Sequence, residues 1–107
     1  VLTTTSAGGR RVGAVLLVDG DGKLAGIFTD ADLARLLVKE GADALTRTIG
    51  DVMTKHAATL PTDALVRDAV QLVREKRLDE LPVVDGDGKP VGLIDVQDLV
   101  GLKVIEG

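Results

Sequence analysis

Three polar residues, Thr29, Asp30 and Asp32, form the most chemically promising group in the chain. They lie where the sequence pattern predicts that a strand ends and a helix begins. The Thr29 hydroxyl can donate to a phosphate beside the free N–H groups of a helix start, and the Asp32 carboxylate can accept from two ribose hydroxyls. Gly26, just upstream, allows close backbone approach. The same residues also fit a helix cap with Thr29 as the N-cap, so spacing alone leaves a nucleotide site and a cap open.

Other residue patterns exclude most catalytic and metal-binding chemistry. The chain has no cysteine, and its one histidine, His56, has no partner for a triad and is expected on the surface of a linker. The run from Asp19 to Gly22 resembles the start of a calcium loop. The fifth and sixth positions are Lys23 and Leu24, where such a loop needs a ligand and a glycine. We therefore predict a hairpin turn, no catalytic residue and no metal site, which does not favour an enzyme.

Composition narrows the class of protein further. A chain of 107 residues fits one compact domain, and its net charge of −4 argues against a surface that tracks nucleic-acid phosphates. Phe28 is the one aromatic residue, so base-stacking platforms are absent. The apolar runs are too short to cross a bilayer, and we expect no signal peptide, because the sequence pattern of one is not seen. We expect a cytoplasmic domain with neither nucleic acid nor membrane as a partner.

An internal repeat is the strongest organisational feature. Sixteen residues starting at Val18 match sixteen starting at Val84, with nine identities at a constant offset of 66 residues. A period of this length indicates two copies of one supersecondary unit rather than a solenoid.

Each copy predicts a β-hairpin followed by a helix. The hairpin strands are expected at 12–18 with 24–28, and at 81–84 with 91–94. Helical spacing predicts one helix over 30–37, with Gly41 as the stop signal, and another over about 96–102. Between the copies we expect a helical turn over 48–53, a strand over 57–60, and a helix with Thr62 as N-cap and Leu65, Ala69 and Leu72 on its apolar face. Residues 1–9 are expected to be the remnant of a helix, so that the first copy lacks its first strand.

Three motifs occur in a distinctive order: Asp51-Val52-Met53-Thr54, Leu81-Pro82-Val83-Val84-Asp85, and the pattern Gly-h-h-Ser/Thr-x-x-Asp (h apolar), which residues 26–32 match fully. Together they resemble a tandem pair of cystathionine-β-synthase (CBS) domains, the Bateman module. The resemblance covers nearly the whole chain. It implies an α+β fold of two β-α-β-β-α repeats with pseudo-twofold symmetry, the first truncated at its N-terminus. It divides the chain into a first repeat, residues 1–47, and a linker with the second repeat, residues 48–107.

The resemblance also implies ligand sites in clefts between the repeats. The first cleft would use Gly26, Ile27, Thr29 and Asp32, and the weaker second cleft Ala57, Ala58, Pro82, Asp95 and Asp98. Asp95 takes the place of Thr29 in the second copy, and its negative charge would repel a phosphate. The implied ligand is an allosteric adenosine nucleotide or a nucleotide-sugar such as CMP-Kdo, and no cofactor is expected.

A narrower resemblance is to the C-terminal region of D-arabinose-5-phosphate isomerases. It rests on GIFTDADLARLL, TIGDVMT and LDELPVVDGDGKPVGLIDVQDL, although that family commonly has Gly-Asp-Leu-Arg-Arg where this chain has Ala31 to Arg35. It implies a regulatory module for an attached isomerase in Kdo and lipopolysaccharide biosynthesis. The alternatives are a structural pair that dimerises its parent without a ligand, and the CBS pair of another enzyme or transporter. Apolar faces with Leu33, Leu36 and Leu37, and with Leu99 and Leu102, predict a homodimer through these helices.

Overall fold

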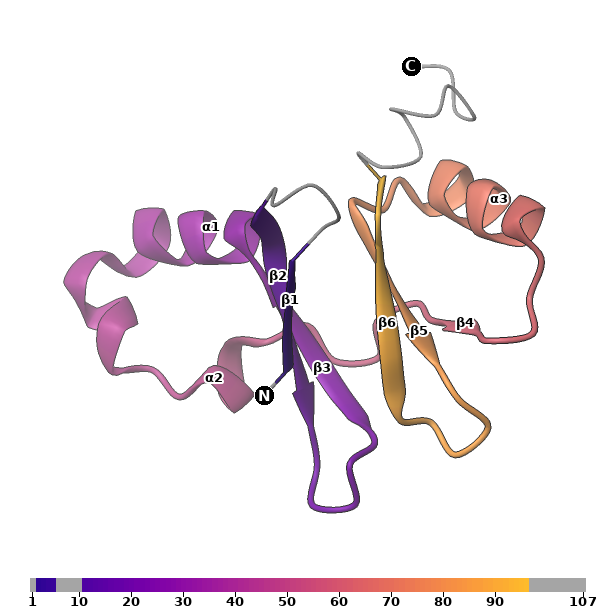
Figure 1. The fold of residues 1–107 in the computed structure, drawn as a ribbon. Helices are drawn as coiled ribbons and strands as arrows, with labels where there is room; N and C mark the ends of the chain where they lie inside the picture. The colour runs from indigo at the N-terminus through magenta and orange to yellow at the C-terminus, as the bar shows by residue number, and fades with distance from the viewer. Residues whose placement is uncertain (1, 6–10, 97–107) are drawn as a thin grey trace. The chain divides into compact units, whose positions relative to one another are not determined.

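The computed structural model describes residues 2–5 and 11–96, and the chain divides into two compact units, residues 1–57 and 58–107. The first unit contains strands β1 (Leu2–Thr5), β2 (Arg11–Val18) and β3 (Leu24–Thr29), helix α1 (Asp30–Glu40), the 3-10 helix η2 (Gly41–Thr46) and the short helix α2 (Ile49–Val52). The second contains β4 (Leu60–Pro61), helix α3 (Val66–Lys76), β5 (Glu80–Val84) and β6 (Pro90–Asp95) (Figure 1). The second predicted post-hairpin helix, at about 96–102, lies almost wholly outside the described residues.

The two predicted hairpins are confirmed, and their strand registers match at the offset of the sequence repeat. In the first, Val15 pairs with Phe28 and Leu16 with Ile27. The second pairs Leu81 with Ile94 and Pro82 with Leu93. Each register shifts at the same place, next to the turn. Equivalent side chains in the two hairpins therefore lie on equivalent faces of their sheets. A shift of the strand pairing by one residue would move every side chain to the opposite face.

The hairpin turns are equally alike, and they account for the repeated Asp-Gly-Asp-Gly sequence without a metal. Asp19 Oδ1 accepts from the backbone N–H groups of Asp21 and Lys23, at 2.9 and 3.1 Å. The equivalent oxygen of Asp85 accepts from residues 87 and 89 at 2.9 and 3.0 Å. The second glycine of each turn has a φ of 81° or 82°, which glycine adopts without strain.

Strand β1 corrects the prediction for the N-terminal segment. Residues 1–9 were expected to be the remnant of a helix, but Leu2–Thr5 form a strand that pairs antiparallel with β2. The physical reason is composition, because three consecutive threonines are β-branched and favour extended backbone. The first unit thus has a three-stranded sheet in the order β1-β2-β3.

The start of α3 is also corrected. Thr62 was expected to cap this helix, but the N-cap is Leu65, whose N–H donates to the Asp68 carboxylate at 2.9 Å. The Thr62 N–H instead donates to the Val84 carbonyl at 3.2 Å, extending the pairing of β4 with β5. Leu65 and Val66 are consequently exposed rather than part of the apolar face.

The core of the second unit forms where α3 covers its sheet. Ala69 and Val73 of α3 are buried with Leu81 of β5, and the surrounding apolar residues are Ala58, Leu60, Leu72, Leu78, Ile94 and Val96. The sheet order is β4-β5-β6, with β4 parallel to β5 and β6 antiparallel to it. Burial of these aliphatic side chains supplies the main stabilisation of this unit.

Candidate functional site

Thr29 and Asp32 meet at the start of α1 as a reciprocal cap. The Asp32 N–H donates to Thr29 Oγ1 at 3.1 Å, and the Thr29 N–H donates to Asp32 Oδ2 at 3.0 Å. This capping box satisfies two backbone donors that would otherwise lack partners. Of the two possibilities that the spacing left open, the cap is therefore present. The Thr29 hydroxyl accepts in this bond, so its own proton stays available to donate, and the cap is compatible with a phosphate contact.

Arg35 occupies the second oxygen of Asp32. Its Nη2 donates to Asp32 Oδ1 at 2.6 Å, and the two residues are one helical turn apart. The Asp32 side chain is 16% exposed and that of Arg35 is 70% exposed. The carboxylate is therefore held from both sides before any ligand arrives, and it holds the guanidinium in turn.

Gly26 allows a close approach by the linker that follows α2. A Cβ atom at Gly26 would lie 2.5 Å from Met53 Sδ and 2.9 Å from the Thr54 carbonyl oxygen, so nothing larger than glycine fits without a shift. The next residue, Ile27, is buried and exchanges two backbone hydrogen bonds with Thr54, at 3.0 and 2.8 Å. The first two residues of the motif thus lie against Met53 and Thr54, which belong to the same unit.

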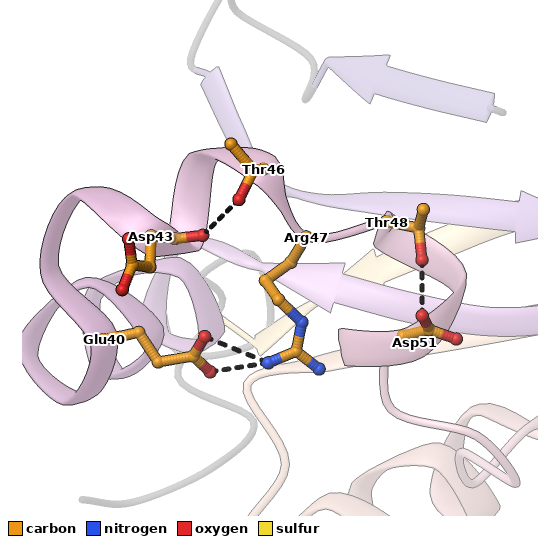
Figure 2. A network of polar contacts seen from close by, with 6 residues as sticks. All are labelled: Glu40, Asp43, Thr46, Arg47, Thr48 and Asp51. Atoms are coloured by element: carbon orange, nitrogen blue, oxygen red, sulfur yellow. Dashed lines mark hydrogen bonds and ion pairs between the residues drawn. The ribbon is translucent and has the colours of Figure 1, made fainter.

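A polar network fixes the path from α1 to α2 (Figure 2). Arg47 Nη1 donates to both carboxylate oxygens of Glu40, at 3.0 and 2.8 Å. Thr48 Oγ1 donates to Asp51 at 2.6 Å, which joins the residue before α2 to its first turn. Thr46 Oγ1 donates to the Asp43 carbonyl at 2.9 Å. These contacts hold the linker in place on the same unit as the Gly26–Asp32 motif.

The residues predicted for the second cleft lie around β4, β5 and β6. Ala58 packs against the core of the second unit, and Pro82 is among its most completely buried residues. Asp95 is buried at the end of β6, the position that matches Thr29. Ala57 is half-buried, and Asp98 lies outside the described residues.

Metal and membrane features are absent from the part of the chain that the structure describes. Within residues 2–5 and 11–96, histidine, aspartate and glutamate nowhere gather in a group of three that could hold a metal ion. No helix in those ranges has the length and apolar character needed to cross a bilayer. His56 is exposed, as expected, and has a φ of 57°.

Three residues that contact the predicted site residues were not assigned there from the sequence: Arg35, Met53 and Thr54. Arg35 stands three residues after Asp32, a helical spacing that favours an ion pair and was a usable signal. Met53 and Thr54 belong to the Asp-Val-Met-Thr motif, which was not predicted to lie at the site. Their contact with Gly26 and Ile27 joins segments about 27 residues apart, and single-sequence periodicity carries no signal for that.

Comparison with models of protein families shows which family this chain belongs to. The model of the CBS domain matches residues 7–39 and 49–104. The chain belongs to the CBS-domain family. The α+β fold predicted for a CBS pair is thereby confirmed, and the second match begins at the linker.

Curated relatives of this CBS pair include arabinose 5-phosphate isomerases. The chain is 40% identical over 94 residues to the arabinose 5-phosphate isomerase KdsD of Pseudomonas aeruginosa, covering 88% of this chain and 28% of that protein. It is 35% identical over 94 residues to the arabinose 5-phosphate isomerase GutQ of Escherichia coli K12, covering 88% and 29%. The chain therefore spans less than a third of the length of these relatives. The predicted resemblance to the CBS region of this isomerase family is confirmed.

Solved structures of CBS pairs resemble this chain over most of its length. One, in complex with 5′-methylthioadenosine and S-adenosyl-L-methionine, superimposes with a TM-score of 0.74 at 28% identity, covering 86% of this chain and 70% of that one. CBSX2 in complex with AMP gives a TM-score of 0.71 at 28% identity, covering 87% and 72%. Both of these relatives hold adenosine compounds.

Proposed function

We propose that this CBS pair is a regulatory module that binds an adenosine nucleotide and modulates an attached arabinose-5-phosphate isomerase. The observation that carries the proposal is the Thr29–Asp32 pair, held at the start of α1 with a hydroxyl proton still free to donate. The structural relatives with AMP or S-adenosyl-L-methionine favour an adenosine ligand over a CMP-activated sugar. The isomerase, its place in Kdo biosynthesis and a cytoplasmic location rest on the curated relatives.

In the proposed first cleft, Thr29 donates to the phosphate and Asp32 accepts from the ribose hydroxyls. The backbone of Gly26 and Ile27 forms the adjoining wall, and Ile27 is hydrogen-bonded there to the backbone of Thr54. The second cleft, with Ala57, Ala58, Pro82, Asp95 and Asp98, binds phosphorylated ligands more weakly, because Asp95 brings a negative charge to the position of Thr29.

Calorimetric titration of AMP into the 107-residue chain tests the binding site. Replacing Asp32 by alanine removes charged hydrogen bonds and should weaken AMP roughly tenfold or more. Asp68→Ala is the matched control, since Asp68 accepts from the N-cap N–H of α3 as Asp32 does in α1. It should lower stability similarly and leave AMP affinity unchanged.

Three results would count against this site. They are equal losses of affinity in the two variants, no AMP binding to the folded wild type, or tighter binding of a CMP-linked sugar than of AMP. A purely structural pair predicts no binding of any of these ligands. Asp98→Ala should cost less affinity than Asp32→Ala, because Asp95 already disfavours phosphate in the second cleft.

A further inference from the structure

Met53 is the single methionine of the chain, and its sulfur lies against the backbone of Gly26. A Cβ atom at Gly26 would come within 2.5 Å of Met53 Sδ and 2.8 Å of its Cγ, so the thioether fills the space that a side chain would need. Met53 directly follows α2, and its N–H donates to the Ile49 carbonyl at 2.9 Å. The backbone of Met53 is therefore fixed to α2 while its side chain covers Gly26.

This contact lies beside the two hydrogen bonds that join the linker to β3. Thr54, the next residue in the chain, exchanges backbone hydrogen bonds with Ile27, which follows Gly26. The Thr54 carbonyl oxygen would itself lie 2.9 Å from a Cβ atom at Gly26. The sulfur, this carbonyl and the glycine are therefore packed together, and a group added to the sulfur must displace one of the others or turn away from both.

A small oxidant in solution can reach this part of the linker. Met53 is half-buried, and the run from Thr54 to His56 that follows it is exposed. The chain contains no cysteine, tryptophan or tyrosine. In such a chain the methionine thioether is the side chain that a peroxide oxidises most readily. Peroxide chemistry on this protein is therefore directed to one sulfur atom.

We propose that Met53 is a modification site, at which hydrogen peroxide or an organic hydroperoxide oxidises the thioether to a sulfoxide. With hydrogen peroxide, a sulfur lone pair attacks one peroxide oxygen, and the O–O bond breaks as the S–O bond forms. The leaving hydroxide takes the proton of the transferred oxygen and departs as water, so sulfur loses two electrons and the peroxide gains them.

The sulfoxide is larger and more polar than the thioether, and it fits the contact with Gly26 less well. Its oxygen is repelled by the Thr54 carbonyl oxygen, since both atoms are hydrogen-bond acceptors. Oxidation of Met53 thereby loosens the two hydrogen bonds between Ile27 and Thr54. This inference does not depend on the proposed function, because it involves no nucleotide.

Mass spectrometry and residue-resolved amide hydrogen exchange of the 107-residue chain, before and after treatment with hydrogen peroxide, test this site. The folded chain should gain the mass of one oxygen atom. The amide protons of Ile27 and Thr54 should then exchange roughly fivefold faster. Val96 of the second unit, whose N–H donates to the Asp79 carbonyl at 2.9 Å, should exchange as before. Methionine sulfoxide reductase should restore both the mass and the slow exchange.

Two variants at residue 53 separate sulfur chemistry from a contact that is merely fragile. Met53→Leu keeps the size and apolar character of the side chain, so slow exchange should persist with and without peroxide. Met53→Gln places a polar group of similar length on Gly26, and it should speed exchange at Ile27 and Thr54 without any peroxide. No ligand enters these measurements, so their failure would be distinct from a failure of the nucleotide site.

Four outcomes would overturn the proposal. The first is a folded chain that gains no oxygen under conditions that oxidise the same chain in urea, because Met53 would then be shielded. The second is an oxidised chain in which exchange at Ile27 and Thr54 is unchanged. The third is an equal increase in exchange at Val96, which would indicate general unfolding. The fourth is faster exchange after peroxide in Met53→Leu, which would place the reaction at another residue.

Discussion

At the scale of single residues, the motif from Gly26 to Asp32 combines structural roles with the proposed binding role. Gly26 is required by packing, because Met53 and the Thr54 carbonyl occupy the space of a side chain. Asp32 completes a capping box and orients Arg35. A substitution at either position therefore alters stability as well as affinity, and its interpretation needs a control matched for the structural role.

Gly26→Ala should destabilise the chain by about 1–3 kcal/mol, the range for an extra methyl group in a packed site. The new Cβ would meet both a flexible methionine and a fixed backbone oxygen, so Met53→Ala in the same chain should restore only part of the loss. Urea unfolding measures both variants. Gly50→Ala, in α2 with nothing within 4 Å of the added atom, should be neutral or slightly stabilising. Equal effects at the two glycines would contradict the packing role of Gly26.

Among the elements, the two longest described helices begin alike, with a carboxylate that accepts from the N-cap N–H: Asp32 in α1 and Asp68 in α3. The end of α3 is less favourable. Arg77 follows the helix in the left-handed region, with a φ of 52°, and Leu78 donates to the Val73 carbonyl at 3.2 Å. This is the position where glycine is most common, because a side chain is strained there.

Arg77→Gly should therefore stabilise the chain, by up to about 1 kcal/mol. Relief of about 1–2 kcal/mol of left-handed strain exceeds the roughly 0.5–1 kcal/mol that glycine loses in chain entropy. Thermal unfolding compares this variant with Arg74→Gly, the same substitution inside α3, which should cost about 1 kcal/mol. A loss of stability at residue 77 as large as that at residue 74 would show that the left-handed conformation carries no strain.

The helices and strands that could be predicted from the sequence are those set by local sequence patterns. The hairpins, their turns, α1 and its stop at Gly41, and the short α2 all follow from alternation, Asp-Gly turns and helical spacing. The prediction failed where a residue takes part in sheet pairing instead. Thr62 was expected to cap a helix, but its N–H donates to the Val84 carbonyl and extends the sheet. At the site the prediction identified Thr29 and Asp32, but could not choose between cap and ligand, because both roles use the same atoms.

For the whole molecule, the homodimer predicted from the sequence involves exposed apolar residues on α1. Leu33 and Leu37 are 41% and 40% exposed on one face of the helix. Burying the remainder of each against a second copy contributes part of the roughly 1.5–3 kcal/mol available to a leucine side chain. The corresponding residues of the second repeat, Leu99 and Leu102, lie outside the described residues.

Sedimentation equilibrium tests this assembly. The wild-type chain should be a dimer at micromolar concentrations, and Leu33→Glu with Leu37→Glu should shift it to a monomer without unfolding it. Val91→Glu, an exposed apolar position on β6, should leave the dimer intact. A wild-type monomer at high micromolar concentration would refute the homodimer, and dissociation by Val91→Glu would place the interface elsewhere.

If the first repeat senses a nucleotide, as we propose, the backbone bridge between Ile27 and Thr54 should respond to that ligand. These residues exchange two hydrogen bonds, at 3.0 and 2.8 Å, where the motif touches the linker to the second unit. Amide hydrogen exchange followed residue by residue, with and without saturating AMP, reports the stability of this bridge. We expect AMP to slow exchange at Ile27 and Thr54 and to change Leu93, the counterpart of Ile27 in the second repeat, much less. Unchanged exchange at both bridge residues while AMP is bound, or equal slowing at Leu93, would contradict a sensor in the first repeat.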